Sequence, residues 1–127
     1  MKENQTRHLE GKGEFDYDYV EDIIFFKVKD RNYEKSLELD RIVVDIDEEN
    51  YIVGIQIFGA SEFLGIGKEA LRNIKKWLFQ ASTDGKRLEI RIVFQTIVRN
   101  KIIEPRPIII EELREFLPDS KVVCTMP

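Results

Sequence analysis

The sequence predicts an α+β fold, an antiparallel sheet with one main amphipathic helix packed on one face and a C-terminal β extension. Three observations predict it. Apolar residues alternate or cluster with strand periodicity in several short segments of the first half, helical spacing appears near residue 70, and strand-like alternation returns near residue 88. The length of 127 residues suits one domain.

The strands expected in the first half are rich in β-branched and aromatic residues. The segments between them contain Asp, Glu and Asn, and Asp and Asn in particular are typical of turns. We expect turns at 18–22 and 30–32 and a hairpin loop at 47–50. We expect the strands at 15–17, 23–29, 36–39, 42–46 and 51–58.

The segment after residue 67 has helical periodicity. Apolar residues recur there at spacings of three and four, and basic residues fall on the opposite face, as in an amphipathic surface helix. Residues 83–86 (Thr-Asp-Gly-Lys) are expected to end this helix. The apolar positions are Ala70, Leu71, Ile74, Trp77 and Leu78, and the basic positions are Lys68, Arg72, Lys75 and Lys76.

The C-terminal extension, residues 80–127, is expected to be mainly β. Apolar and polar residues alternate from Leu88 to Gln95, as in a strand with one buried face. A second strand is expected within 102–110, at an edge because Pro105 and Pro107 lack amide donors. A short helix at 111–116 and a last edge strand at 121–124 complete the prediction.

Composition narrows the class of protein. Charged residues make up 35% of the chain and it contains seventeen Ile against four Gln, which favours a thermophilic source. No apolar run approaches the length of a membrane helix, and the polar N-terminus lacks the apolar segment of a signal peptide. We therefore expect a cytoplasmic protein with a flexible polar tail at 1–13 and one domain at 14–127.

The net charge of −4 is unevenly distributed. Residues 1–64 contain 8 Lys/Arg and 16 Asp/Glu, a balance of −8, and residues 65–127 contain 12 and 8, a balance of +4. Two interpretations follow. The acidic face of one molecule could meet the basic face of another or of an acidic partner, or the two halves could mix in space and weaken the asymmetry.

An ordered set of short motifs in the first half resembles the domain-of-unknown-function family 2283. The motifs are Phe15-Asp16-Tyr17, Asp22-Ile23-Ile24-Phe25, Ser36, Val44-Asp45-Ile46-Asp47, Val53-Gly54-Ile55-Gln56-Ile57 and Ala60-Ser61. The resemblance covers residues 15–64, and Gln56 replaces a residue that is usually acidic in the family. It implies a small antiparallel sheet followed by a helix, a family-like core at 15–79, and a companion of small toxin-like proteins. It implies no catalytic residues.

Acidic clusters are the first candidate sites. Asp45, Asp47 and Glu49 alternate as in a calcium loop, but Asn50 and Gln56 stand where that loop needs Gly and a bidentate Glu. A solvated hairpin turn is the simpler interpretation. Asp16, Asp18, Glu21 and Asp22 could in principle work as acid and base, but no pocket that would separate their pKa values is indicated, and a turn rich in acids is the favoured interpretation.

The basic helix face of Lys68, Arg72, Lys75 and Lys76 is a candidate nucleic-acid surface, because phosphate binding needs clustered positive charge. An ordinary solvated helix face is the alternative. His8 is the only histidine, and it lies in the expected tail, which excludes histidine triads and multi-histidine metal sites. Cys124, the only cysteine, follows two valines and is expected to be buried.

Three functional hypotheses follow from these patterns, none of them requiring a cofactor. The favoured one is a non-enzymatic binding module, an antitoxin-like partner of another small protein. The others are a nucleic-acid binder using the basic second half and a small enzyme using carboxylates. Edge strands and the Ile108-Ile109-Ile110 run also predict a symmetric dimer.

Overall fold

The computed structural model describes residues 6–127, and within them the protein is mostly β. The expected α+β fold is wrong, because ten strands are accompanied by only two helices of five residues each. The strands are β1 (Arg7–Asp18), β2 (Ile23–Val28), β3 (Tyr33–Glu38), β4 (Ile42–Asp47), β5 (Ile52–Phe58), β6 (Lys76–Asp84), β7 (Arg87–Val98), β8 (Lys101–Ile103), β9 (Ile108–Glu112) and β10 (Ser120–Thr125). The helices are α1 (Ala60–Leu64) and α2 (Lys68–Arg72).

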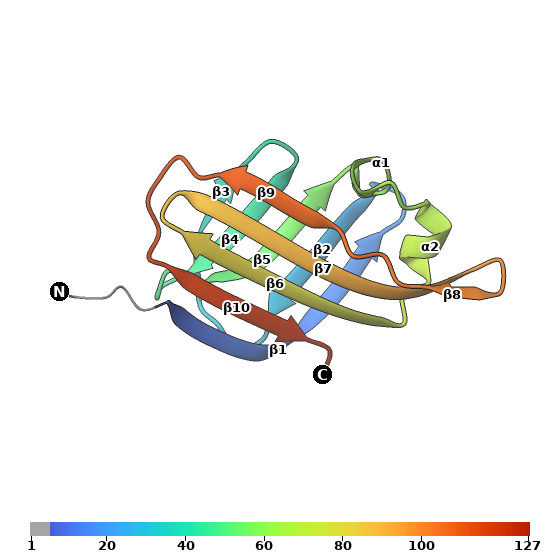
Figure 1. Ribbon diagram of the computed structural model, residues 1–127, viewed down its shortest axis with the longest axis horizontal. Helices are drawn as coiled ribbons and strands as arrows, with labels where there is room; N and C mark the ends of the chain where they lie inside the picture. The colour runs from blue at the N-terminus through green and yellow to red at the C-terminus, as the bar shows by residue number, and fades with distance from the viewer. Residues whose placement is uncertain (1–5) are drawn as a thin grey trace.

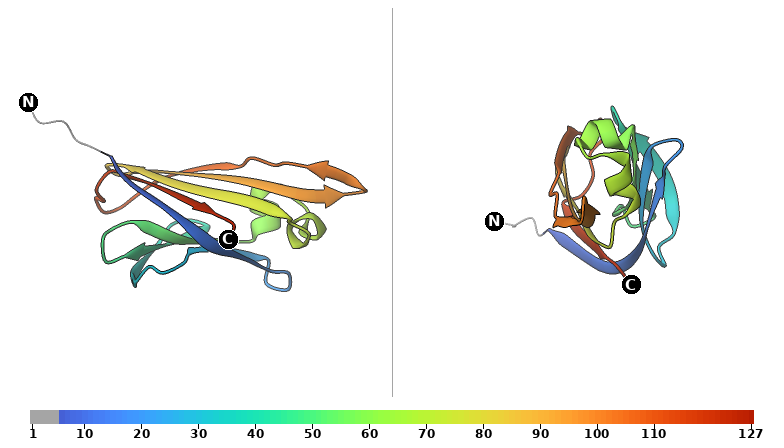
Figure 2. Two further views of the ribbon diagram at one scale, coloured as in Figure 1. Left: turned by 90° about the horizontal axis from the view of Figure 1, so that it is seen from below. Right: turned by 90° about the vertical axis from the view of Figure 1, so that its right-hand side faces the viewer.

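All ten strands are connected through one ladder, in the order β3-β4-β5-β2-β1-β10-β6-β7-β8, with β9 paired to β7 (Figure 1). The ladder folds over at β1 into two facing layers (Figure 2). We call β3, β4, β5, β2 and the second half of β1 the N-terminal sheet. The first half of β1 with β10, β6, β7, β9 and β8 is the C-terminal sheet. The layers are joined along β1, and β3 and β9 lie on the opposite, open side (Figure 2).

Strand β1 belongs to both layers. Residues 7–12 pair in parallel with β10, and residues 13–18 pair antiparallel with β2. At the change of partner, a Cβ on Gly13 would lie 2.0 Å from the Cys124 Sγ and 2.7 Å from the Lys27 carbonyl oxygen. Only glycine fits there. The flexible tail expected at 1–13 is therefore wrong for residues 7–13, and residues 1–5 lie outside the described residues.

The core lies between the two layers and is centred on aromatic rings. Phe26 of β2 stacks on Phe79 of β6 with 5.4 Å between ring centroids, and it packs edge-on against Trp77 at 5.3 Å. Phe15 of β1 contacts Phe94 of β7 at 6.3 Å. Such aromatic pairs stabilise a fold beyond the apolar area that they bury, and here they connect the two sheets.

The main helix expected around residues 68–78 is wrong. Helix α2 ends at Arg72, and Trp77 and Leu78 belong to β6. Alternation in β6 is hidden in the sequence because its inward positions after Phe79 are Ala81 and Thr83, which are small or polar. Thr83 can be buried without a large energetic cost because its hydroxyl donates a hydrogen bond to the Pro118 carbonyl at 2.9 Å. A core position occupied by a satisfied polar group carries no hydrophobic signal.

Other parts of the prediction agree better with the structure. The strand alternating from residue 88 lies within β7, and the strands expected at 23–29, 42–46 and 51–58 overlap β2, β4 and β5. The strand expected at 121–124 overlaps β10, but its expected edge position is wrong, because β10 pairs with both β1 and β6. The expected short helix at 111–116 is wrong, because residues 111 and 112 continue β9 and no helix follows in the described chain. The strand expected within 102–110 divides into β8 and β9 around the two prolines.

Candidate functional site

The aspartates of the family-like motifs fall into two groups by their surroundings, and Asp22 belongs to the structural group. Its carboxylate accepts hydrogen bonds from the Tyr17 hydroxyl at 2.6 Å, the Ser61 hydroxyl at 2.7 Å and the Ser61 amide at 3.0 Å. Its own carbonyl accepts from the Ala60 amide at 2.9 Å. Asp22 therefore connects the β1–β2 turn to the start of α1.

Burial and hydrogen bonding oppose each other at this carboxylate. Burial favours the neutral acid, but the hydrogen bonds from Tyr17 and Ser61 outweigh it and hold the pKa of Asp22 below its ordinary value of 3.8. Burial raises the pKa of the Tyr17 phenol above its usual range, and the bond to Asp22 raises it further. Asp22 is thus an ionised carboxylate held in place, which is a structural arrangement.

Asp47 is also structural, although it was a metal candidate. Its side chain is 1% exposed and pairs with the Arg31 guanidinium at 2.6 Å. It also accepts from the backbone amides of Glu49 at 3.0 Å and Tyr51 at 2.9 Å, so it organises the β4–β5 turn. These partners occupy the oxygen atoms that a metal would use. Within residues 6–127, no group of three or more metal-ligating side chains is present.

Asp45, by contrast, lies on the outer face of the N-terminal sheet. Its carboxylate accepts from the Ser36 hydroxyl at 2.7 Å, and that hydroxyl lies 3.0 Å from the Tyr33 hydroxyl. The other carboxylate oxygen lies over Gly54 of the next strand, where a Cβ would come within 2.8 Å of it. A glycine at this position leaves room for Asp45, which lies half-buried between the exposed Ser36 of β3 and Gly54 of β5.

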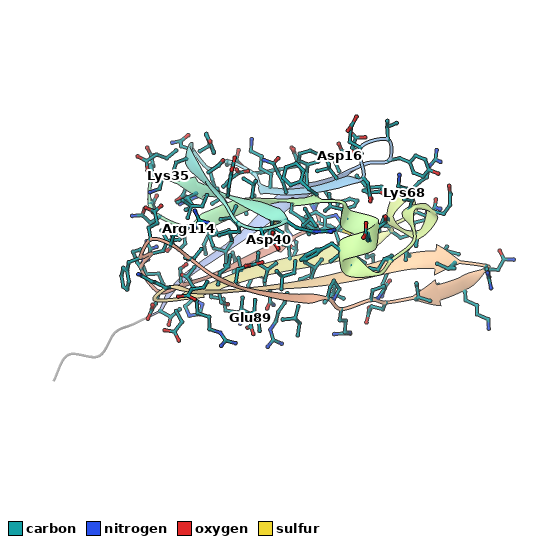
Figure 3. The ribbon with its side chains drawn as sticks, turned by 90° about the horizontal axis from the view of Figure 1, so that it is seen from above. Asp16, Lys35, Asp40, Lys68, Glu89 and Arg114 are labelled. Atoms are coloured by element: carbon teal, nitrogen blue, oxygen red, sulfur yellow. The ribbon has the colours of Figure 1, made fainter. Side chains whose placement is uncertain are left out.

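A shallow outer groove of about 320 Å³ lies beside Asp45. Strand alternation brings Asp16 of β1 and Asp45 of β4 to its lining, together with Phe25 and Gln56 between them. Lys27 and Glu14 complete its charged groups. In Figure 3, Asp16 lies on this outer side of the molecule and Glu89 on the opposite side. The structure thus places two acids that are 29 positions apart in the sequence on one groove, with strands β2 and β5 between them.

The basic residues expected on one helix face are distributed over three elements. Lys68 and Arg72 lie on α2, and both approach the Tyr19 ring, with Nζ and Cζ 5.4 Å and 4.6 Å from its centroid. Lys75 lies in the connection after α2, and Lys76 begins β6. No single helix face carries all of them, so the predicted geometry of a nucleic-acid-binding helix is wrong, although the charges themselves are exposed or half-buried.

The largest of the grooves that we describe lies at the end of the sandwich where both helices are found, and sequence patterns did not reveal it. This end groove of about 730 Å³ has a mainly apolar lining with Glu69, Asn73 and Arg99 as polar groups. It is formed between α1, α2 and the projecting β7–β8 hairpin (Figure 1). Its main apolar contacts come from Leu64, Ile66, Ala70, Ile97, Val98, Ile103 and Pro105.

His8 and Cys124 lie in neighbouring strands, away from both grooves. His8 is in β1, which was expected to be a tail, and its partner in β10 is Lys121. Cys124 is fully buried, as expected, and burial raises its pKa to about 11. A thiol with a raised pKa and no access to solvent is a poor nucleophile. The expectation of a buried, structural cysteine is confirmed.

Comparison with known proteins identifies the family. Residues 14–61 match the family described as "Protein of unknown function (DUF2283)", and the chain belongs to it. The matched region spans β2 to β5 with most of the second half of β1, so it covers the N-terminal sheet and the outer groove. The end groove lies beyond it, since its lining begins at Leu64.

Two archaeal relatives extend the similarity. A Methanosarcina mazei protein named "Putative hypoxanthine phosphoribosyltransferase" is 38% identical over 92 residues, which cover 71% of this chain and 73% of that protein. An uncharacterised protein of Methanocaldococcus jannaschii is 36% identical over 67 residues, covering 52% of this chain and 58% of that protein. No solved structure matches. Among the described residues, no helix is long and apolar enough to cross a membrane.

Proposed function

We propose that this protein is a non-enzymatic binding module that docks another small protein in the end groove, as an antitoxin-like companion would. The observation that carries the proposal is the character of this groove. Its volume of about 730 Å³ falls within the range of specific binding sites, and its lining is mainly apolar with three polar side chains. Such a lining favours the binding of apolar groups.

The surroundings of the groove indicate the chemistry of the partner. Ile97 is 42% and Ile103 37% exposed, so both present apolar surface to a docked segment. Arg99 and Glu69 line the groove, and two further cations, Lys68 and Lys101, begin the bordering elements α2 and β8. We expect a partner segment that inserts apolar side chains and carries acidic residues beside them, because complementary charge steers and orients binding.

Site-specific cross-linking in the native host tests this proposal. A photo-reactive amino acid at position 103 should capture a protein partner, and the captured peptide should be apolar and acidic. The same amino acid at Phe116, which is 68% exposed in the β9–β10 connection at the opposite end of the sandwich, serves as the control and should capture no such peptide. Equal capture at both positions, or none at position 103, would contradict the end groove as the docking site.

Native mass spectrometry of the protein gently purified from its host gives an independent answer. An added mass of one small protein, lost in an Ile103→Glu variant, supports the proposal. An added nucleic-acid mass would instead support the basic residues as a phosphate-binding surface, and binding that weakens steeply across a salt series would corroborate it. Bare chains alone, under every growth condition, would overturn the binding module.

A carboxylate-based enzyme is the second candidate, because the fold brings Asp16 and Asp45 to the lining of one outer groove. Two carboxylates near one substrate can act as acid and base when their surroundings differ. A metabolite panel with Asp16→Asn and Asp45→Asn variants tests this candidate. Activity that both variants reduce about a hundredfold or more would establish it. Equal activity in the variants and the parent would reject these acids.

The name of the M. mazei relative raises phosphoribosyl transfer as a further activity to assay. That reaction requires a site for a diphosphate. Sites of this kind commonly use the N-terminus of a long helix beside a glycine-rich loop, whereas the helices described here have five residues each. Incubation with hypoxanthine and 5-phosphoribosyl diphosphate is a direct assay. Formation of the nucleotide product would replace the binding-module proposal.

A further inference from the structure

Strand β9 is a sheet edge with an unusual arrangement of residues. Within residues 6–127 it pairs only with β7, so its other side is unpaired. The extended segment is longer than β9 itself. The Phe94 amide donates to the Pro105 carbonyl and the Ile92 amide to the Pro107 carbonyl, both at 3.1 Å, and the Leu113 amide donates to the Lys86 carbonyl.

These hydrogen bonds fix which backbone groups point outward. In an antiparallel pair, alternate residues direct both backbone groups toward the partner strand. Residues 105, 107 and 113 face β7, so the odd-numbered residues of this segment do so. The even-numbered residues Arg106, Ile108, Ile110 and Glu112 therefore direct their amide and carbonyl groups away from β7. Both prolines fall at inward-facing positions, so every outward-facing residue retains its amide donor.

The side chains of these outward-facing residues form a self-complementary sequence. Ile108 is 52% and Ile110 53% exposed, and both lie on the outer face of the C-terminal sheet. Arg106 precedes them and Glu112 follows them, and both are exposed. The edge thus reads basic, apolar, apolar, acidic. Reversing the direction of such a strand places each charge opposite its complement.

We propose that β9 pairs with β9 of a second copy, antiparallel about a twofold axis at Ile109. In this register Ile108 lies opposite Ile110 of the other copy, and Arg106 lies opposite its Glu112. The outward-facing residues then exchange backbone hydrogen bonds, and the two C-terminal sheets become one continuous sheet. A twofold axis makes both halves of the interface equivalent, so each favourable pair occurs twice.

The charges around the acidic end support this register. Glu38, Asp40, Glu111 and Glu112 line a polar hollow on the open side of the sandwich, where Arg114 supplies the positive charge. Figure 3 shows Asp40 and Arg114 on this side. A second copy in the proposed register brings its Arg106 to this surplus of carboxylates. Arg106 contacts Glu104 of its own chain and, with five N–H groups, can donate to both.

Strand β3, the free edge at the far end of the strand order, is a poorer pairing surface. It carries Glu34, Lys35 and Glu38, and Lys35 forms an ion pair with Glu115 at 2.8 Å across the open side. Charged side chains along an edge are a common protection against pairing. The exposed residues of β9 are Ile108 and Ile110, with Glu112 at its end and Arg106 two residues before its start. The second copy is therefore expected at β9 and not at β3.

Charge reversal provides the test. In Arg106→Glu or Glu112→Arg, a homodimer would contain two like-charge pairs, so we expect self-association about tenfold weaker or more. Mixing the two variants restores both pairs. The introduced glutamate of one chain then meets the introduced arginine of the other, and the unchanged Arg106 meets the unchanged Glu112. Sedimentation velocity over roughly 1 to 300 µM protein is a suitable measurement, since a single strand edge forms a small interface.

Restored association in the mixture, with each variant alone monomeric, supports the proposed register. A wild-type protein that remains monomeric at the highest concentration would overturn it, and so would variants that associate as well as the wild type. Both positions are exposed, and unchanged thermal unfolding of each variant verifies that the fold is intact. None of these results depends on the end groove, so this inference and the proposed function can fail separately.

A disulfide experiment tests the register itself. Residues opposite each other in a hydrogen-bonded pair have Cα atoms about 5.5 Å apart, which suits a disulfide. We therefore expect a mixture of Ile108→Cys and Ile110→Cys chains to form mixed disulfides faster than either chain alone. Cys124 is buried and does not compete. Equal rates in the mixture and in the separate chains would contradict a centre at Ile109.

Discussion

Four aspartates of the matched family region take different roles because their strand positions differ. Asp22 and Asp47 lie at the ends of strands, where several donors converge on each carboxylate. Asp16 and Asp45 lie within strands and point to the outer groove. Acids that satisfy turn amides are part of the fold, whereas acids on the lining of an outer groove can contact other molecules. The second pair is therefore the one to mutate for function.

The first prediction concerns Asp22. An Asp22→Asn variant loses the charge that accepts from Tyr17 and Ser61, and we expect a loss of about 1–2 kcal/mol in the free energy of unfolding. The pKa of Asp22 in the folded state lies below 3.8, so its stabilisation is present above about pH 4 and disappears as the pH falls through the folded-state value. Denaturant unfolding at several pH values measures this difference.

Asp30 provides a matched control for Asp22. Both residues have a positive φ, 57° for Asp22 and 62° for Asp30, and asparagine tolerates this conformation well. Asp30→Asn changes the same charge at an exposed position, and we expect it to shift stability by less than about 0.5 kcal/mol. If both variants lose equal stability at neutral pH, the hydrogen bonds of Asp22 do not contribute as described.

The second prediction concerns the ion pair of Arg31 and Asp47. Because Asp47 is 1% exposed, removing its cation leaves a buried carboxylate held only by backbone amides. We expect Arg31→Ala to cost about 2–3 kcal/mol. Arg91→Ala, which removes a solvent-exposed partner of Glu89, should cost about 0.5 kcal/mol. Chemical denaturation of both variants gives the comparison, and similar losses would show that burial of Asp47 is unimportant.

Two elements determine the architecture: β1, which joins the layers, and β6, which replaces the expected helix. Strand β1 changes partners at Gly13 because only a residue without a Cβ lets Cys124 and the Lys27 carbonyl approach so closely. Strand β6 connects β10 to β7 with nine paired residues along β7. Its pairing outweighs a helical pattern in residues 70–78, since tertiary contacts regularly override local propensity.

The third prediction tests the change of partner in β1. Gly13→Ala introduces a Cβ that must displace the Cys124 sulfur and a backbone carbonyl, and we expect a loss of about 3 kcal/mol. At Gly11 an added Cβ meets only a Val28 methyl group at 2.9 Å, and Gly11→Ala should cost about 1 kcal/mol. Thermal unfolding ranks the two variants. A milder effect at Gly13 than at Gly11 would contradict the described crossing.

At the scale of the whole molecule, two sheets share one strand, and the aromatic core is buried between them. Cys124 lies beside the shared strand, in register with Gly11 and close to Gly13, and is fully buried. The two layers cannot separate along β1 without exposing the thiol of Cys124. The open side, by contrast, ends in β9, where a second copy would continue the sheet.

The fourth prediction uses Cys124 as a reporter of unfolding. Its pKa is raised to about 11 by burial, whereas its ordinary value is 9.0. The unfolded chain therefore loses a proton first as the pH rises, and stability should fall between about pH 9 and 11. Native protein at pH 8 should react slowly with iodoacetamide, and the rate should rise with denaturant in parallel with global unfolding. Fast labelling of Cys124 without denaturant would contradict its burial beside β1.

Most of the β-strands and the family could be predicted from local features of the sequence. Alternating strands such as β2 and β7 were predictable because one buried face imposes a period of two. Strand β5, whose first four residues are all buried, was predictable from its cluster of β-branched residues. The motifs that carry the family resemblance were also local, and the match over residues 14–61 confirms them. The acids of the outer groove were identified individually, but their convergence was not.

The remaining features depend on contacts between residues far apart in the sequence. Thr83 could occupy a core position only because a carbonyl 35 residues away accepts its hydrogen bond, so no local pattern marked β6 as a strand. The first half of β1 has polar, glycine-containing sequence, and it is ordered by pairing with β10 from the other end of the chain. Both grooves and the free edge of β9 arise from such long-range pairing. A sequence records local preferences, whereas these surfaces depend on which distant strands become neighbours.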